Sequence, residues 1–234
     1  MKDIQSQQDS RRIGIRKVGV KTITYPIRLL DKARNTQHTV ARVNMYVNLP
    51  HRFKGTHMSR FIEILNRFHG DFKLKTFQHI LEEMKVRLNA ETAHLEMAFP
   101  YFLQRDQRSM PGWVQYECRL RGSLASKLEL LVEVDVPVPL FYSPAHPPES
   151  PVPAGFWGMV TASVQMNRFL WLEDLIDLIE QGAISLEAGV PGSVEPLCRR
   201  ISDTLGGHGS FTWYKVVVKK MSSGYSTYAS TEWP

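Results

Sequence analysis

Arg42-Val-Asn-Met-Tyr-Val-Asn-Leu49 is the stretch that decides the fold class of this 234-residue chain. Apolar and polar side chains alternate along it, the apolar set being Val43, Met45, Val47 and Leu49 and the polar set Arg42, Asn44 and Asn48. Successive side chains of a strand point to opposite faces of a sheet, so a period of two predicts a strand with one buried face.

The surrounding residues extend this strand into a β-β-α-α-β-β unit. Residues 13–30 read as a second strand, and the turn-forming residues 32–36 join it to residues 38–49 as a hairpin. Two helices are predicted next, with Thr56 as the cap of the first. Their apolar residues recur at helical spacing and comprise Phe61, Ile64, Leu65 and Phe68, then Phe77, Ile80, Leu81, Met84 and Leu88. Strands near 93–104 and 113–122 complete the unit.

The second half of the chain repeats the pattern. Strands are predicted at 128–138 and 160–166, and a closing pair at 211–219 and 225–231. Two helices lie between these pairs, with apolar stripes of Leu172, Leu175, Ile176 and Ile179, then Val194, Leu197, Ile201 and Leu205. The chain is therefore predicted to be α+β, with two tandem β-β-α-α-β-β modules and antiparallel sheets. The expected limits are 1–12 for a flexible N-terminus, 13–124 for the first module and 125–234 for the second.

Composition excludes several classes of protein. Hydrophobic residues make up 43% of the chain, which is typical of a globular protein, and no apolar run reaches the roughly 18 residues that span a bilayer. The polar N-terminus lacks the apolar segment of a signal peptide. The two cysteines, Cys118 and Cys198, rule out a disulfide framework, favour the cytoplasm and are expected to be core thiols.

The charge of the chain is uneven. The net charge is +6, and residues 1–60 hold 13 Lys and Arg against 3 Asp and Glu. The basic residues are scattered and belong to no recognisable nucleic-acid module, so a solvated face is expected in place of a nucleic-acid partner.

Two long strings carry a resemblance to a known family. Phe53-Lys-Gly-Thr-His-Met-Ser-Arg-Phe61 and Asn89-Ala-Glu-Thr-Ala-His-Leu-Glu-Met97 resemble type IB GTP cyclohydrolases, which are metal-dependent hydrolases of the tunnelling-fold superfamily. The resemblance implies two tunnelling-fold modules per subunit. It also implies subunits that join through their sheets into barrels, as a homotetramer or homodimer with active sites at subunit interfaces.

The expected metal-binding motifs are replaced. The family loop after the strand ending at Val138 reads Cys-Pro-Cys-Ser-Lys, but this chain has Tyr142 and Pro144 at the cysteine positions. The family's C-terminal Glu-Ser-Ile-His-x-His motif corresponds to a stretch in which Ser222 replaces the purine-anchoring Glu and Tyr225 a His. Metal-activated water needs thiolate, imidazole or carboxylate ligands. The alignment therefore predicts an enzyme with no metal and no cofactor, which acts on a small molecule less polar than GTP by acid-base or cyclisation chemistry.

Candidate residues follow from this hypothesis. Tyr142, His146 and Glu149 lie in the replaced loop, and a His with a pKa near 6.5 suits proton transfer. The candidate substrate-binding residues include His57 and Arg60 at a helix start, where anions bind well. The others are Phe141, Phe156, Trp157, Ser222 and Tyr225. Each of these residues also has a plain structural interpretation, as an exposed loop residue, a helix cap or a packing residue.

Two further hypotheses remain open. The chain could be a catalytically silent homologue that serves as a binding or regulatory subunit. It could also be a GTP cyclohydrolase with relocated metal ligands, of which His57, His94 and Glu96 are the candidates. Alternation places His94 and Glu96 on one face of their strand, and Ala93 and Leu95 on the other.

Overall fold

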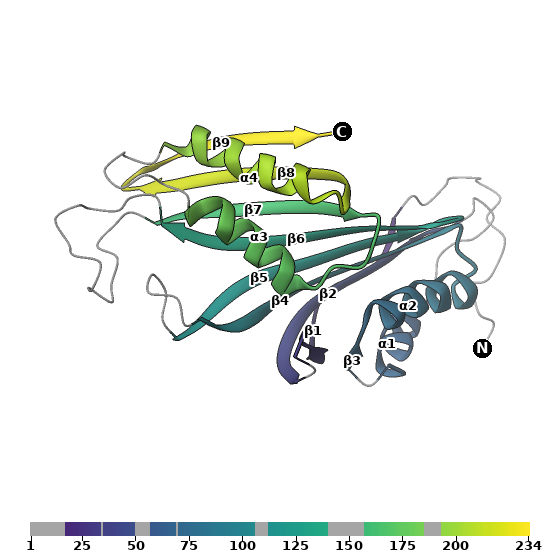
Figure 1. Cartoon of the computed structure of the whole chain (residues 1–234). Helices are drawn as coiled ribbons and strands as arrows, with labels where there is room; N and C mark the ends of the chain where they lie inside the picture. The colour runs from purple at the N-terminus through teal and green to yellow at the C-terminus, as the bar shows by residue number, and fades with distance from the viewer. Residues whose placement is uncertain are drawn as a thin grey trace, which may run out of the picture. The chain divides into compact units, whose positions relative to one another are not determined.

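A computed structural model describes residues 17–33, 35–49, 57–68, 70–105, 112–139, 157–184 and 193–234. The first half of the chain holds β1 (Val18–Leu30), β2 (Thr36–Asn48), α1 (Met58–Asn66), β3 (Asp71–Phe72), α2 (Leu74–Arg87), β4 (Thr92–Arg105) and β5 (Gly112–Leu124). The second half holds β6 (Leu128–Pro139), β7 (Trp157–Met166), α3 (Leu172–Ile184), α4 (Val194–His208), β8 (Phe211–Ser222) and β9 (Tyr225–Trp233) (Figure 1). The predicted α+β fold with two β-β-α-α-β-β modules is confirmed.

The strands follow the order β3-β1-β2-β4-β5-β6-β7-β8-β9. β1 pairs with β2, and β2 with β4, in antiparallel register, as do β6 with β7, β7 with β8 and β8 with β9. The short β3 is parallel to β1. The chain divides into two compact units, of which the first takes in residues up to 99 and 119–130 and the second takes in 100–118 and 131–234. The long strands β4, β5 and β6 each contribute residues to both units.

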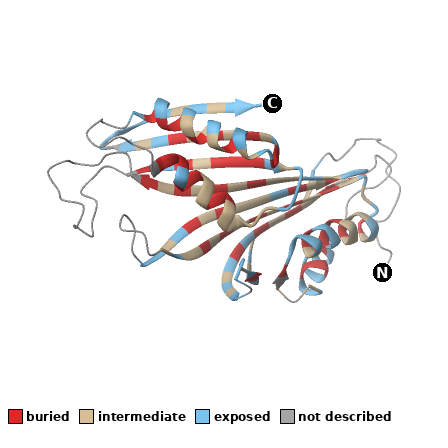
Figure 2. Ribbon diagram, viewed as in Figure 1, coloured by how far each residue is buried: buried red, intermediate tan, exposed pale blue. Residues whose placement is uncertain are grey.

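The alternation along β2 is as predicted. Val43, Met45 and Val47 have no exposed surface, while Asn44, Tyr46 and Asn48 are half-buried on the other face. Figure 2 shows the same change between buried and less buried positions along other strands of the chain. Burying a large aliphatic side chain contributes roughly 1.5–3 kcal/mol, so the apolar face fixes which side of each strand meets the helices.

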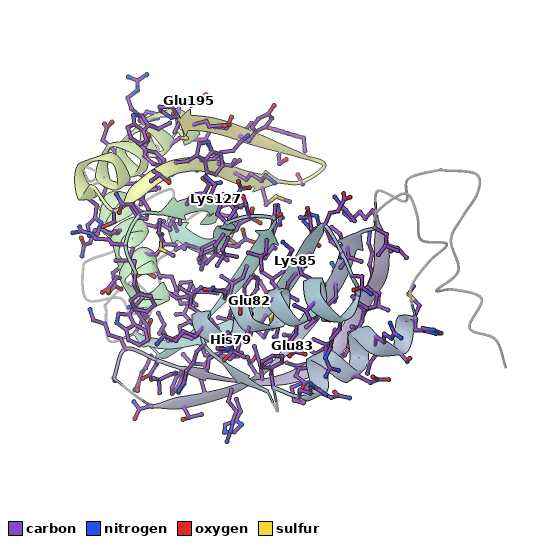
Figure 3. The ribbon with its side chains drawn as sticks, turned by 90° about the vertical axis from the view of Figure 1, so that its right-hand side faces the viewer. His79, Glu82, Glu83, Lys85, Lys127 and Glu195 are labelled. Carbon is purple, nitrogen blue, oxygen red and sulfur yellow. The ribbon has the colours of Figure 1, made fainter. Side chains whose placement is uncertain are left out.

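Helices α1 and α2 cover the apolar face in the first unit. Their buried residues are Phe61, Ile64 and Leu65 in α1, and Phe77, Ile80, Leu81 and Met84 in α2. Two contacts fix α2 against residues 119–130. Phe77 packs closely on Gly122 of β5, and the Lys85 ammonium donates a hydrogen bond to the Ala125 carbonyl in the turn that follows β5. Figure 3 labels Lys85 on α2.

Helices α3 and α4 cover the apolar face in the second unit. Leu175, Ile176 and Ile179 of α3 are buried, as are the α4 residues Leu197, Cys198, Ile201 and Leu205. Helix α4 packs on β8 and β9 and against α3. It ends at Gly209, whose φ of 67° is the left-handed conformation that glycine adopts readily. Cys118 and Cys198 are both buried, which confirms that they are core thiols.

Some local features differ from the predictions. Helix α1 begins at Met58 with His57 as its N-cap, and no side chain caps it. Thr56, the predicted cap, lies outside the described residues. Strand β3 was not predicted, because two residues are too few to show a period. The limits given above for the N-terminal segment (1–12) and for the two modules (13–124 and 125–234) stay predictions. Within the described residues, no helix has both the length and the apolar character that crossing a membrane requires.

The packing of Phe77 on Gly122 gives the first testable prediction. A Cβ at position 122 would lie 2.2 Å from Cε1 of Phe77 and 3.1 Å from Cδ1 of Leu81, so Gly122→Ala overpacks the core. We expect the free energy of unfolding, measured by urea denaturation, to fall by about 1–3 kcal/mol. Gly207→Ala in α4 is the control, because a Cβ there meets no atom within 4 Å. An unchanged midpoint of urea denaturation in Gly122→Ala would contradict the close packing of Phe77 on Gly122.

Candidate functional site

Four side chains form a polar cluster on the face of the first unit that points away from α1 and α2. Asn44 lies directly opposite Glu96 in the β2–β4 ladder, and Tyr46 lies opposite His94. All four are half-buried, whereas the intervening Ala93 and Leu95 are fully buried. The prediction that His94 and Glu96 share a face is thereby confirmed. We call Asn44, Tyr46, His94 and Glu96 the β2–β4 polar cluster.

The Glu96 carboxylate is at the centre of this cluster. Asn44 Nδ2 donates a hydrogen bond to its Oε2 at 2.9 Å, and the Tyr46 hydroxyl donates one to its Oε1, also at 2.9 Å. Each carboxylate oxygen therefore has one fixed neutral donor. Two donors on two different oxygens set the plane of the carboxylate as well as its position.

A bulge in β1 helps to hold Asn44. The register between β1 and β2 shifts between Val20 and Ile23, and Thr22 in this bulge has a φ of 62°. A positive φ is unfavourable for a β-branched residue, and bulges and strained residues of this kind gather near functional sites. The Thr22 N–H donates to Asn44 Oδ1 at 2.9 Å, so one amide side chain links the bulge to Glu96.

The rings of Tyr46 and His94 form a stacked pair. Their centroids are 4.7 Å apart, with an angle of 17° between the planes. The Lys17 ammonium lies 3.6 Å from the centroid of the Tyr46 ring, in cation–π contact. Gly19 is paired with Tyr46, and a Cβ there would lie 2.0 Å from the Met45 carbonyl oxygen, so only glycine allows this approach of β1 to β2.

The cluster controls the charge of its own members. Burial alone would raise the pKa of Glu96, but hydrogen bonds from Asn44 and Tyr46, with the charges of Lys17 and Arg121, outweigh it and lower the pKa below its usual value. Burial and the Lys17 charge lower the pKa of His94, against the opposing effect of Glu96. Burial and the hydrogen bond to Glu96 raise the pKa of Tyr46 to about 12. At neutral pH the site thus presents an ionised carboxylate, a neutral imidazole and an intact phenol.

These charge states define what the cluster can do chemically. An ionised carboxylate accepts hydrogen bonds and donates none, so it suits a ligand with paired N–H groups. A neutral imidazole can accept a proton, as a general base requires. The nearby positive charges of Lys17 and Arg121 favour an anionic ligand.

Removing the Tyr46 hydroxyl tests the electrostatics of the cluster. Tyr46→Phe deletes a hydrogen bond that stabilises the charged form of Glu96, so we expect the pKa of Glu96 to rise relative to the native protein. The measurement is an NMR titration of the Glu96 carboxyl carbon. Tyr228→Phe is the control, since that side chain is exposed on β9. A Glu96 pKa that does not move in Tyr46→Phe would show that the hydroxyl does not hold the carboxylate.

A second polar cluster lies in the second unit, beneath α3. Arg105 of β4 contacts Asp177 and Glu180 of α3, with Nη1 2.8 Å from an Asp177 oxygen and Nη2 3.1 Å from Glu180 Oε2. The Tyr116 hydroxyl donates to Glu180 at 2.5 Å and accepts from Arg105 Nε at 3.1 Å. Burial has the largest effect on the pKa of Glu180 and raises it, and the charge of Asp177 raises it too. Hydrogen bonds from Tyr116 and Arg105, with the positive charge of Arg105, oppose this shift. Only 5% of the Glu180 side chain is exposed, so this group ties α3 to β4 and β5 and is closed to a ligand.

Breaking this second cluster should destabilise the protein. Arg105→Met leaves the Glu180 carboxylate buried without its cation, and we expect a loss of about 3–5 kcal/mol in the free energy of unfolding. The pKa of Glu180 would rise further in this variant. Because the folded chain then binds the proton more tightly than the unfolded chain, stability falls as pH rises through that pKa. The free energy of unfolding lost in Arg105→Met should therefore be smaller at about pH 5 than at about pH 8.

The control for this experiment is Asp177→Asn. Asp177 is 41% exposed at its side chain and contacts the same guanidinium, so its loss should lower the free energy of unfolding by about 1 kcal/mol or less. Equal losses in the two variants would show that burial of Glu180 is not the source of the effect.

The predicted site residues fall into three groups. Phe141, Tyr142, His146, Glu149 and Phe156 lie outside the described residues. In the first unit, His57 caps α1 and its carbonyl accepts a hydrogen bond from the Arg60 N–H at 3.2 Å.

The remaining predicted residues lie in the second unit. Trp157 opens β7 opposite Pro139. Ser222 and Tyr225 are brought together as partners across the turn between β8 and β9, where Tyr225 is 67% exposed. Nothing in the structure tests whether these residues bind a substrate, so their assignment to the site stays a prediction.

The hypothesis of a relocated metal site named His57, His94 and Glu96 as its ligands. Within the part of the chain that the structure describes, no three His, Cys, Asp or Glu side chains converge on one point where a metal ion could bind. The two cysteines are buried, and burial raises the pKa of Cys198, which disfavours the thiolate that binds metals. The described residues of one chain therefore do not fit the metal that the family resemblance implies.

Sequence reasoning missed most of the β2–β4 polar cluster. It identified His94 and Glu96, but not their partners Asn44 and Tyr46, nor Lys17 and Arg121. The signal was present in part, because Asn44 belongs to the polar set of the strand at 42–49. What was lacking was the pairing of β2 with β4, which joins residues 52 positions apart.

The fold and the site together describe a protein with two tandem β-β-α-α-β-β modules and a polar cluster on the face of a strand pair that points away from α1 and α2. Solved structures that share this fold include uricases. The enzyme from Arthrobacter globiformis aligns with a TM-score of 0.62 at 8% identity, over 94% of this chain and 92% of its own. That from Bacillus fastidious aligns with the same score and identity over 92% of each chain. At this identity the likeness concerns the fold alone.

The sequence relatives are more specific. The family model described as type I GTP cyclohydrolase FolE2 matches residues 1–141. GTP cyclohydrolase FolE2 of Syntrophobacter fumaroxidans is 41% identical over 254 aligned positions, which cover 99% of each chain. The protein of the same name from Syntrophotalea carbinolica is 38% identical over 254 positions, covering 100% of this chain and 96% of the relative. This chain belongs to the type I GTP cyclohydrolase FolE2 family.

The relatives overturn one prediction. A metal-independent enzyme with a new, more apolar substrate was inferred from the loop at 141–157 and the C-terminal stretch. That hypothesis gave these short segments more weight than the rest of the chain. Identity of 38–41% over essentially the whole chain, to proteins named GTP cyclohydrolase, supports the family's own activity instead.

Proposed function

We propose that this protein is a GTP cyclohydrolase, which opens the imidazole ring of GTP with water and releases formate. The observation that carries this proposal is the full-length identity to FolE2 proteins, which leaves little of either chain unmatched. The uneven charge of the chain agrees with it, because a triphosphate is strongly anionic and residues 1–60 are rich in Lys and Arg.

The β2–β4 polar cluster supplies groups that this reaction needs. The neutral His94 imidazole can accept a proton from the attacking water and, once it is protonated, pass that proton to the leaving nitrogen. Stacking on Tyr46 holds the His94 ring in a fixed plane, so its nitrogens keep their directions. Lys17 and Arg121 bring positive charge to the same face, where they favour the phosphates.

The metal-binding arrangement is proposed to differ from the family motif. The chain has cysteines only at 118 and 198, and both are buried, so neither can replace the missing Cys-Pro-Cys loop. The metals to be added in the assay of GTP turnover are manganese, zinc and iron.

Assembly and location belong to the same proposal. The strand order ends at β9, which is exposed along most of its length and carries Tyr225, Tyr228 and Trp233. An open edge of this kind is a ready surface for pairing with another strand. A homotetramer or homodimer in the cytoplasm, with no nucleic-acid partner, fits this edge and the family resemblance.

The test is release of formate from GTP by the purified protein, with and without each metal. We expect turnover, and we expect His94→Ala to lower kcat/KM by about 100-fold or more because a proton-transfer group is lost. His79→Ala is the matched control, since His79 is exposed on α2 (Figure 3). A protein that releases no formate under any of these conditions would support the silent-homologue hypothesis and refute this proposal.

A further inference from the structure

We infer that Asn44, Glu96 and Tyr46 form a positioning network, anchored at the bulge in β1, that fixes the direction of the His94 imidazole. Each of these three residues acts on the reaction through the next one and finally through His94. The inference rests on the proposed function, which gives His94 the proton transfer but gives no task to Asn44 or Glu96. All of these residues belong to the first unit.

The His94 imidazole has few restraints of its own. The contact that the described residues give its ring is the stack on Tyr46, with centroids 4.7 Å apart, and no hydrogen bond from them fixes either ring nitrogen. The nitrogens are thereby left for proton transfer, but the direction in which they point depends on Tyr46. A stack of two rings is a weak restraint, so the Tyr46 ring has to be fixed by something else.

The Tyr46 ring is fixed at its hydroxyl end. The hydroxyl donates a hydrogen bond to Glu96 Oε1 at 2.9 Å, and a hydrogen bond to an ionised acceptor is stronger than one between neutral groups. Burial and this hydrogen bond raise the pKa of Tyr46 to about 12, so the phenol keeps its proton and the bond persists at neutral pH. The ring is therefore held by the strand at one end and by Glu96 at the other.

Glu96 is held in turn by Asn44 and the bulge in β1. Asn44 Nδ2 donates to Glu96 Oε2 at 2.9 Å, and Asn44 Oδ1 accepts from the Thr22 N–H at 2.9 Å. Thr22 has a φ of 62°, a strained conformation that persists only where the surrounding structure holds it. The network thus begins at a backbone group whose position is set by the sheet, which is how a precise site is supported.

The competing interpretation is that these bonds only stabilise the sheet. In that case a substitution at Tyr46 would weaken folding, but its effect on the rate of the reaction would be the same whether or not His94 is present. If the network positions the imidazole, its effect on the rate disappears once the imidazole is removed. The two interpretations therefore differ in one measurable quantity.

The first experiment asks whether Tyr46 acts through His94. Formate release from GTP is measured for Tyr46→Leu, made in the native protein and in His94→Ala. In the native protein we expect kcat to fall by about tenfold or more, with the KM for GTP changed by about twofold or less, because a small misplacement of a reacting group is costly. In His94→Ala the same substitution should change kcat by about twofold or less. Equal losses of kcat in the two proteins would overturn the inference.

A second pair of variants tests whether the bonds act in series. Asn44→Leu removes one donor to Glu96, and Tyr46→Phe removes the bond to Glu96 but keeps the ring for stacking. Each should lower kcat by about threefold or more, and the double variant should lose about as much as Tyr46→Phe alone. Tyr228→Phe is the control, because Tyr228 is exposed on β9, and it should keep the native kcat. Losses that multiply in the double variant would show two independent effects and contradict the network.

A measurement without turnover separates this inference from the proposed function. The NMR signal of the His94 Cε1–H group, assigned by its absence from His94→Ala, reports the stacking of the imidazole on Tyr46. It should shift or broaden in Asn44→Leu and stay at its native position in Tyr228→Phe. An unmoved signal in Asn44→Leu would overturn the inference even if the protein releases formate. A native protein that releases no formate refutes the proposed function, and the shift in Asn44→Leu would still support the positioning network.

Discussion

The alternation of apolar and polar side chains along β2 and β4 is the constraint on which both the fold of the first unit and its candidate site depend. Val43, Met45, Ala93 and Leu95 are fully buried, and this fixes the register in which Asn44 meets Glu96 and Tyr46 meets His94. A slip of one residue would send the apolar set to the open face and the polar set into the core. The same burial that stabilises the sheet therefore assembles the polar cluster.

The two polar clusters show how surroundings decide what a carboxylate can do. Glu96 is half-buried, bound by two neutral donors and near positive charge, so its pKa is lowered and two acceptor positions are left for a ligand. Glu180 is almost fully buried, bound by Tyr116 and Arg105, and its pKa is raised by burial. The first carboxylate suits recognition, and the second suits the attachment of a helix to a sheet.

Much of the fold could be predicted from the sequence, and much less of the site. Periods of two and of 3.6 residues located the strands and helices, and alternation alone placed His94 and Glu96 on one face. The bond from Asn44 to Glu96 depends on the pairing of strands far apart in the chain, and the bulge at Thr22 leaves no trace in the periodicity. The prediction of function failed for a different reason. The loop at 141–157 differs from the family motif, yet the identity to FolE2 proteins extends over the whole chain.

The central claim is that GTP binds at the face of β2 and β4 that carries the β2–β4 polar cluster. A crystal structure of the protein grown with GTP tests it most directly. The account predicts the nucleotide against the β2–β4 polar cluster, within reach of the His94 imidazole. Density for the nucleotide away from this cluster would contradict it.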